Sequence, residues 1–264
     1  GSTYKLGELL KSVIIASAND SAVALAEYLC GAEEAFVRRM NERAQELGLE
    51  NTHYVNCTGL PAQGHYTTAR DVAKLSAHLD EHPLYYQYST IWMDEILHRG
   101  GRVTGLTNTN RLIRFYPDCD GYKTGSTNEA KYCISATAKK NGMRLIAVVL
   151  GTSAGQTRFD EARAMLEYGF AGYQMFSAVG EGEALNMSVP VRLGGRDSVS
   201  VVSGGDCGLL IKKGGQGDIS LEAALVESVH APVCEGDVLG EIRVKQGERI
   251  VAIVPAVAGE TVQL

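Results

Sequence analysis

The chain has 264 residues, with 45% hydrophobic and 21% charged side chains, which is an ordinary balance for a globular protein. This length exceeds what one hydrophobic core comfortably holds, so we expect two domains. The formal net charge of −6 and the lack of a Lys/Arg-rich run argue against a nucleic-acid partner, and no apolar run reaches the roughly eighteen residues that span a bilayer.

The first part of the chain is patterned as helices. Apolar residues recur at helical spacing from Leu6 to Ile14, and this helix runs into Ser17-Ala18-Asn19. Asp20 suits the cap of a second helix, and Thr68-x-x-Asp71 resembles a capping box that opens a later one. The further helices are predicted at 20–30, 33–47 and 68–79.

From residue 91 the pattern changes to strands. We predict a hairpin around Gly100-Gly101, and a third strand in which polar and apolar residues alternate. Asn141-Gly142 favours a type I′ turn, and the apolar run Leu145–Leu150 is expected of a central strand covered on both faces. A helix over 159–170 closes this part of the chain. The first three strands are predicted at 91–97, 102–108 and 131–137.

After residue 176 the character shifts again. Short apolar-alternating segments are separated by glycine pairs such as Gly194-Gly195 and Gly204-Gly205, which predicts a small all-β sandwich or barrel. In the first domain helices precede an antiparallel sheet, so its class is α+β. We therefore expect an α+β domain over residues 1–176 and an all-β domain over 177–264.

Two short motifs carry the candidate chemistry. Ser17-Ala18-Asn19 ends an apolar helix, and alone it fits a helix-ending turn in which polar side chains satisfy stray carbonyls. Lys123-Thr124-Gly125 offers a cation, a hydroxyl and a residue without a side chain, beside which a substrate can approach the backbone closely. Alone it fits a solvated strand edge.

Together these motifs resemble the second and third active-site boxes of the penicillin-binding protein and β-lactamase superfamily. Longer runs resemble the D-alanyl-D-alanine carboxypeptidases, the low-molecular-weight penicillin-binding proteins, in order along essentially the whole chain. Near the C-terminus, Ala231-Pro232-Val233 and Gly236-x-x-x-Gly240 resemble the β domain of this group. The other runs that carry the resemblance are Ser17–Ala26, Gly48–His53, Thr67–Asp71 and Asp120–Gly125.

The resemblance implies a penicillin-binding, β-lactamase-like domain that removes the terminal D-Ala from peptidoglycan stem peptides through a serine acyl-enzyme, and that β-lactams trap. By position, Ser17 would relay a proton toward the leaving amine, and Asn19 would bind the substrate amide. Lys123 would support the relay and, with Thr124, hold the terminal carboxylate.

The same resemblance assigns binding roles around the third box. The strand at Gly125 would lie against the substrate, and the Ser126 N–H would donate to the oxyanion. Arg158, at the head of the last helix of the first domain, would lie near the carboxylate, although a surface ion pair is an equally good interpretation. The implied location is extracytoplasmic, and any membrane association would use a segment that this sequence lacks.

The nucleophile box of the family, Ser-x-x-Lys, is the missing motif. Ser2-Thr3-Tyr4-Lys5 has the letters, but the helical pattern starts only at Leu6 and the distance to Ser17 is too short. We expect this chain alone to lack the nucleophile. We also expect that the loss of the helix that carries this box leaves a cavity in the first domain. Three situations would account for a folded chain: a separate fragment supplies the helix, the domain rearranges, or the chain is part of a longer molecule.

Alternatives remain open at this stage. One alternative is a related enzyme, either an endopeptidase or a β-lactamase, and the C-terminal β domain disfavours the β-lactamase. Another alternative is a non-catalytic cell-wall-binding or scaffold protein. The six cysteines form no Cys-x-x-Cys pair, and His78 with His82 fits a polar helix end better than a metal site. We predict no metal and no cofactor.

Overall fold

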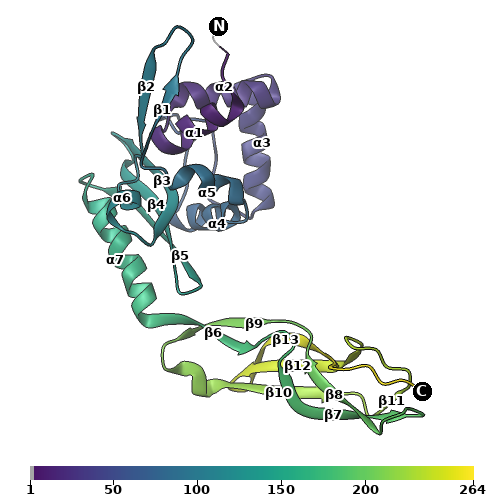
Figure 1. Cartoon of the computed structure of the whole chain (residues 1–264). Helices are drawn as coiled ribbons and strands as arrows, with labels where there is room; N and C mark the ends of the chain where they lie inside the picture. The colour runs from purple at the N-terminus through teal and green to yellow at the C-terminus, as the bar shows by residue number, and fades with distance from the viewer. Residues whose placement is uncertain (1–2) are drawn as a thin grey trace. The chain divides into compact units, whose positions relative to one another are not determined.

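The computed structural model describes residues 3–264 and divides the chain into two compact units, Gly1–Phe170 and Ala171–Leu264. The boundary that we expected after residue 176 falls inside the strand β6 (Tyr173–Val179). The α+β class of the first unit and the β class of the second are confirmed (Figure 1). No helix of the described residues combines the length and apolar character needed to cross a bilayer.

The helices of the first unit follow the predicted order. An additional helix, α5, occupies a segment that we did not predict as helical; it starts at Pro83, whose fixed φ suits the first helical position. The helices are α1 (Leu6–Ala16), α2 (Asn19–Cys30), α3 (Glu33–Glu46), α4 (Ala69–Leu79), α5 (Pro83–Ser89), α6 (Leu112–Phe115) and α7 (Thr157–Gly172).

The start of α4 also anchors the loop of residues 51–66. Thr68 caps the helix, because its hydroxyl accepts the Asp71 N–H at 3.2 Å. The buried Asp71 carboxylate does not complete the predicted capping box; it accepts instead from the Asn51 N–H and the Thr52 hydroxyl, each at 2.8 Å. These bonds join the beginning of the loop to α4.

The main sheet of the first unit consists of β3 (Cys119–Thr127), β4 (Lys131–Lys140) and β5 (Met143–Thr152), in that antiparallel order. Asn141 and Gly142 have φ values of 50° and 76°, as the predicted type I′ turn requires. The prediction that 145–150 is a central strand is wrong within the described residues, where β4 is central and β5 lies at an edge. Small residues fill β4, and they are buried on both faces.

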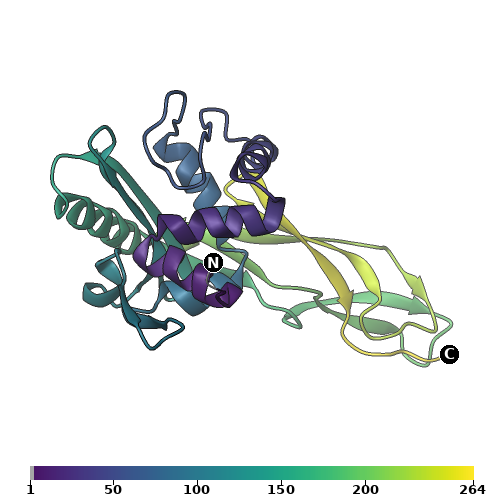
Figure 2. The ribbon, with the colours of Figure 1, turned by 90° about the horizontal axis from the view of Figure 1, so that it is seen from above.

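Helices cover both faces of this sheet. On one face lie α6 and α7 (Figures 1 and 2). They share an apolar cluster with the sheet that includes Ile134, Ala136, Phe159 and Leu166. On the other face α4 contacts β4 through a buried pair of hydroxyls, Ser76 and Ser135, 2.7 Å apart.

The ion pairs of one arginine connect the end of α4 with the start of β3. The Arg144 side chain, on β5, forms ion pairs with Asp80 at 2.7 Å and with Asp120 at 2.8 Å. The beginning of β3 is therefore fixed by charged as well as apolar contacts.

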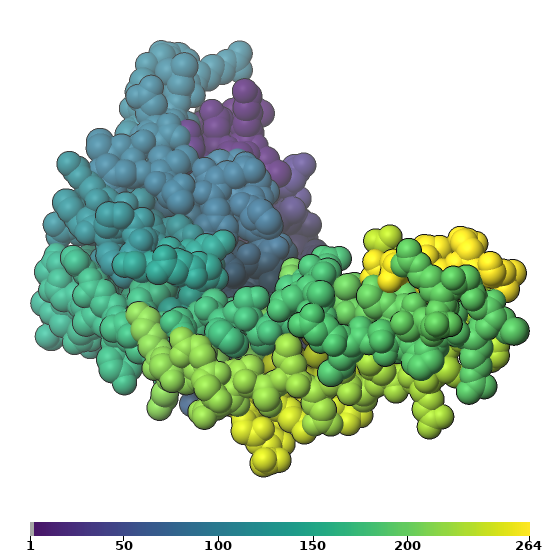
Figure 3. All heavy atoms as spheres, turned by 60° about the horizontal axis from the view of Figure 1, so that its bottom comes forward, coloured from purple at the N-terminus to yellow at the C-terminus, as the bar shows by residue number. Residues whose placement is uncertain are grey.

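The predicted hairpin consists of β1 (Met93–Leu97) and β2 (Val103–Thr107). Its apolar side packs on α1, where Ile15, Ile96 and Leu106 form a small buried cluster. The tip of the hairpin projects from the surface of the unit (Figure 3).

The second unit is built from strands around its own apolar core of mainly valine, isoleucine and alanine. A six-stranded sheet has the order β10-β12-β13-β8-β7-β11, and β6 pairs with β9 in a separate ribbon. The sequence pattern did not show β10. The remaining strands are β7 (Ala184–Arg192), β8 (Ser198–Ser203), β9 (Cys207–Lys212), β10 (Ile219–Leu225), β11 (Val229–His230), β12 (Val238–Gln246) and β13 (Arg249–Ala258).

Candidate functional site

A cavity of about 540 Å³ lies in the first unit. Its walls are the turn between α1 and α2, the loop of residues 51–66, the second half of β3 and the start of α7. Every residue predicted for the site lines it. Those residues are Ser17, Asn19, Lys123, Thr124, Gly125, Ser126 and Arg158.

The turn between α1 and α2 presents Ser17 and Asn19 to this cavity. Ser17 adopts the left-handed conformation, with φ 58° and ψ 41°, which is uncommon for a residue other than glycine. The Ser17 N–H donates to the Val13 carbonyl at 3.1 Å and the Ala18 N–H to the Ser12 carbonyl at 3.2 Å, so the helix ends in a left-handed C-cap turn. Asn19 then opens α2, and the side chains of Ser17 and Asn19 are both exposed to solvent. The tight reversal is what brings both polar groups to one wall.

Lys123, on β3, lines the same cavity. Its ammonium donates to the Thr124 carbonyl at 2.9 Å. Burial, and secondarily the charge of Arg158, lowers the pKa of Lys123 from 10.5 to about 8. A group with this pKa exchanges a proton readily near neutral pH, which is the property required of a general acid or base.

The polar wall continues with Thr124 and Arg158. The Thr124 hydroxyl is buried and donates to the Thr109 hydroxyl at 2.7 Å. The Arg158 guanidinium donates to the main-chain carbonyls of Gly125 and Cys133, at 2.9 and 3.2 Å. No carboxylate of the described residues forms an ion pair with Arg158, so residues 3–264 do not contain the surface ion pair that was the alternative interpretation.

The cavity therefore holds two cationic side chains whose charge the neighbouring side chains do not neutralise. Burial also lowers the pKa of Arg158, because the low-polarity surroundings disfavour its charged form. An anionic group that enters would relieve this cost at both cations. The arrangement suits a carboxylate, which can accept from a guanidinium, an ammonium and a hydroxyl together.

The loop of residues 51–66 supplies a wall that the sequence reasoning missed. Tyr54, Cys57 and His65 line the cavity, although no short-range pattern marked them. Burial and a hydrogen bond with Glu33 raise the pKa of the Cys57 thiol to about 11, so it stays protonated and is a poor nucleophile near neutral pH. Asn41, on α3, holds the loop by bonding both the N–H and the carbonyl of Tyr54 at 2.8 Å.

No serine that lines the cavity has a lysine one helical turn later. Asp20 follows Ser17 by three residues, and Glu129 follows Ser126. The rejected motif at residues 2–5 starts at Ser2, which lies outside the described residues. Its lysine, Lys5, precedes the first residue of α1 and is not part of the helix.

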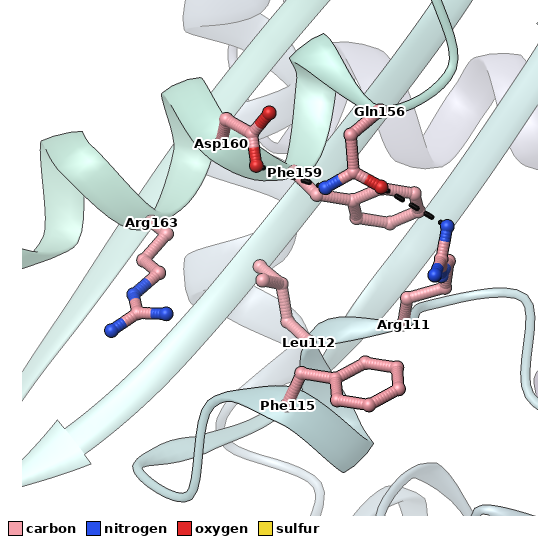
Figure 4. A pocket seen from close by; sticks show the side chains of 7 residues that line it. All are labelled: Arg111, Leu112, Phe115, Gln156, Phe159, Asp160 and Arg163. Atoms are coloured by element: carbon pink, nitrogen blue, oxygen red, sulfur yellow. Dashed lines mark hydrogen bonds between the residues drawn. The ribbon is translucent and has the colours of Figure 1, made fainter.

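A smaller hollow of about 190 Å³ lies between α6 and α7 (Figure 4). Arg111 donates to the Gln156 carbonyl oxygen at 3.0 Å, and Gln156 donates to Asp160 at 2.9 Å. Arg163 lies on the opposite side of the hollow in the view of Figure 4. The hollow is lined by none of the predicted site residues and by no residue with a hydroxyl or thiol nucleophile. Residues 3–264 also contain no group of three or more His, Cys, Asp or Glu side chains arranged to hold a metal ion.

Comparison with known proteins identifies the chain's relatives. The D-alanyl-D-alanine carboxypeptidase family matches residues 1–154, and the C-terminal domain of penicillin-binding protein 5 matches residues 173–264. The D-alanyl-D-alanine carboxypeptidase DacF of Bacillus subtilis is 37% identical over 261 residues, covering 98% of this chain and 67% of the relative. DacC of Escherichia coli is 32% identical over 100% of this chain and 65% of its own length.

Solved structures agree with these relatives. Penicillin binding protein 5 from Haemophilus influenzae superposes with a TM-score of 0.70 at 30% identity, covering 98% of this chain and 74% of that one. A peptidoglycan synthesis regulatory factor (PBP3) from Streptococcus pneumoniae gives a TM-score of 0.76 at 26% identity, covering 98% and 78%. The chain spans about two thirds or less of several curated relatives, for example 67%, 65% and 60%. With a family match over more than half of its length, the chain belongs to the D-alanyl-D-alanine carboxypeptidase family.

Proposed function

We propose that the cavity binds the D-Ala-D-Ala end of a peptidoglycan stem peptide and contributes to serine-type carboxypeptidase chemistry that removes the terminal D-Ala. One observation carries this proposal: the turn with Ser17 and Asn19 and the strand with Lys123, Thr124 and Gly125 line the same cavity. The curated relatives named above are D-alanyl-D-alanine carboxypeptidases, which supports the assignment of substrate and reaction.

The proposed roles divide between the two walls. Ser17 passes a proton toward the leaving amine, and Lys123, with its pKa near 8, supports that transfer. Asn19 donates to and accepts from the substrate amide. Because Ser17 is held by a helix-ending turn, its hydroxyl reaches the cavity without a flexible linker.

Carboxylate recognition is assigned to the strand wall. Lys123 and Arg158 supply donors for the terminal carboxylate, and Thr124 joins them by turning its hydroxyl proton from Thr109 to the carboxylate. Gly125 lets the substrate backbone lie against the strand, and the N–H of Ser126 donates to the oxyanion. Loss of one such donor typically lowers a rate by about 10²–10³-fold.

The nucleophile is proposed to come from a Ser-x-x-Lys segment outside residues 1–264, as part of the same gene product or as a separate N-terminal fragment or chain. An apolar cavity of about 290 Å³ between α3, α4 and the loop supports a missing packing partner, since Met40 and Tyr54 line both it and the site. The substrate places the protein outside the cytoplasm, with β-lactams as further ligands. Any membrane attachment would be through a segment that is not in this chain.

A fluorescent penicillin tests this division of labour. We expect residues 1–264 alone to remain unlabelled, and a chain extended upstream to a Ser-x-x-Lys box to be labelled at that serine. Labelling of a serine within residues 1–264 would contradict the proposed origin of the nucleophile. An upstream coding sequence without the box would instead favour a non-catalytic, cell-wall-binding relative, in which the carboxylate wall binds peptide without cleaving it.

A further inference from the structure

The segment Asn108-Thr109-Asn110, which we call the connector, joins β2 to α6 and contacts both walls of the cavity. Asn108 and Asn110 are 5% and 1% exposed, so their amide groups are enclosed by protein. Buried amides are costly unless they are hydrogen-bonded. The partners of these amides therefore show what the connector holds.

The connector binds the helix that carries the Ser17 turn. The Thr109 N–H donates to the Ile15 carbonyl at 3.0 Å. Ile15 is fully buried and lies two residues before Ser17. This bond fixes the end of α1 at the point where the chain turns into the cavity.

The connector also binds the strand that carries Lys123. The Asn110 amide donates to the Gly121 carbonyl at 3.1 Å, two residues before Lys123. The Thr109 hydroxyl accepts from the Thr124 hydroxyl at 2.7 Å, directly after Lys123. Lys123 is thus bracketed by two bonds from adjacent connector residues.

Further bonds make the connector rigid. The Asn108 amide donates to the carbonyls of Ser89 and Ile91, both at 2.9 Å, and its oxygen accepts the Asn110 N–H at 2.9 Å. Ser89 in turn donates to the Asp120 carbonyl at 2.5 Å. The connector is therefore fixed to the end of α5 as well as to the two walls.

We propose that Asn108, Thr109 and Asn110 are positioning residues that hold the Ser17 turn and the Lys123 strand at a fixed separation across one cavity. This inference rests on the proposed function, because only that function gives the separation between the Ser17 turn and the Lys123 strand a catalytic meaning. Thr109 has an additional part: its hydroxyl accepts the Thr124 hydroxyl proton while no ligand is bound, and it fixes the position from which Thr124 turns that proton toward a carboxylate.

The matched variants are Asn110→Ala and Asn41→Ala. Each asparagine donates to one main-chain carbonyl and accepts one main-chain N–H, but Asn41 bonds only the loop at Tyr54. The readout is the pKa of Lys123, measured by NMR of its side chain without any ligand. We expect Asn110→Ala to raise this pKa by at least about one unit, because the loosened walls admit water to the ammonium. We expect Asn41→Ala to raise it by less, because Asn41 holds only the loop and neither of the two walls that the connector joins.

An unchanged Lys123 pKa in folded Asn110→Ala, or equal changes in both variants, would overturn the proposal. Native-state hydrogen exchange of the unmodified chain tests it without a substitution, should Asn110→Ala fail to fold. We expect the Thr109 amide to exchange only through unfolding of the whole first unit, and exchange through local opening would overturn the proposal. Neither readout needs substrate or nucleophile, so failure of the proposed function would show separately, as absent peptide binding.

Discussion

Replacing Lys123 by methionine should stabilise the first unit at neutral pH, although it removes a proposed catalytic group. The buried ammonium is unfavourable in the fold, as its pKa of about 8 against an ordinary 10.5 indicates. At about 1.36 kcal/mol per pKa unit, this difference corresponds to roughly 3 kcal/mol of lost stability below pH 8. Methionine keeps the length of the side chain but loses the bond to the Thr124 carbonyl, worth about 1 kcal/mol. The expected net gain is about 2 kcal/mol at pH 7.

The pH dependence follows from proton linkage. Between pH 8 and 10.5 the unfolded chain retains the Lys123 proton that the folded chain has released, so wild-type stability gains from this group as pH rises. The advantage of Lys123→Met should therefore shrink across this window. It should reverse by about 1 kcal/mol near pH 10.5, where the neutral amine still donates its hydrogen bond.

Urea unfolding at a series of pH values measures this difference. Trp92 is the single tryptophan and lies half-buried in the first unit, so its fluorescence follows that unit separately from the second. Subtracting the wild-type free energy of unfolding from that of Lys123→Met at each pH cancels the other titrating groups. A difference that stays constant from pH 7 to 10.5, or a destabilised variant at pH 7, would show that the buried ammonium of Lys123 does not destabilise the fold.

Two further predictions concern stability alone. Gly240→Ala should lower the free energy of unfolding of the second unit by about 3 kcal/mol or more, because a Cβ there would lie 2.2 Å from a main-chain oxygen. Gly217→Ala has open space around the new Cβ and should change this free energy by less than about 1 kcal/mol. Circular-dichroism melts measure both. Arg144→Met leaves two aspartates without their partially buried partner and should lower the stability of the first unit by about 3 kcal/mol. Arg163→Met breaks an exposed pair and should have a much smaller effect in the Trp92 assay. Equal effects of the two glycine variants would show that the close contact at Gly240 does not decide the outcome, and equal effects of the two arginine variants would show the same for burial.

Short-range sequence patterns predicted most of the helices and strands of the first unit. The helical spacing of apolar residues and the turn preference of Asn141-Gly142 act over a few residues, so the sequence reports them directly. α5 was missed because its tyrosines and polar residues form no clear apolar stripe, and its start at Pro83 is a weak signal. β5 was misplaced because an apolar run does not distinguish an edge strand that helices cover from a central strand.

The site shows the same limit more sharply. Ser17 and Lys123 were found because their motifs are contiguous in sequence. Thr109, Tyr54 and His65 were missed because they reach the cavity only through tertiary packing, and nothing in their neighbours marks them. The fixation of the two walls by the connector is also invisible in sequence, since its hydrogen bonds to Ile15, Gly121 and Thr124 form only when the chain has folded.

Amide NMR of residues 1–264 can show whether the cavity recognises a D-alanine carboxylate. Titration with a peptide ending in D-Ala-D-Ala should shift the signals of the Ser17 turn and of Lys123 to Ser126. A peptide ending in L-Ala-L-Ala, or the D-Ala-D-Ala peptide with an amidated C-terminus, should leave them unmoved. Equal shifts with all three peptides, or shifts confined to residues outside the cavity, would contradict the account.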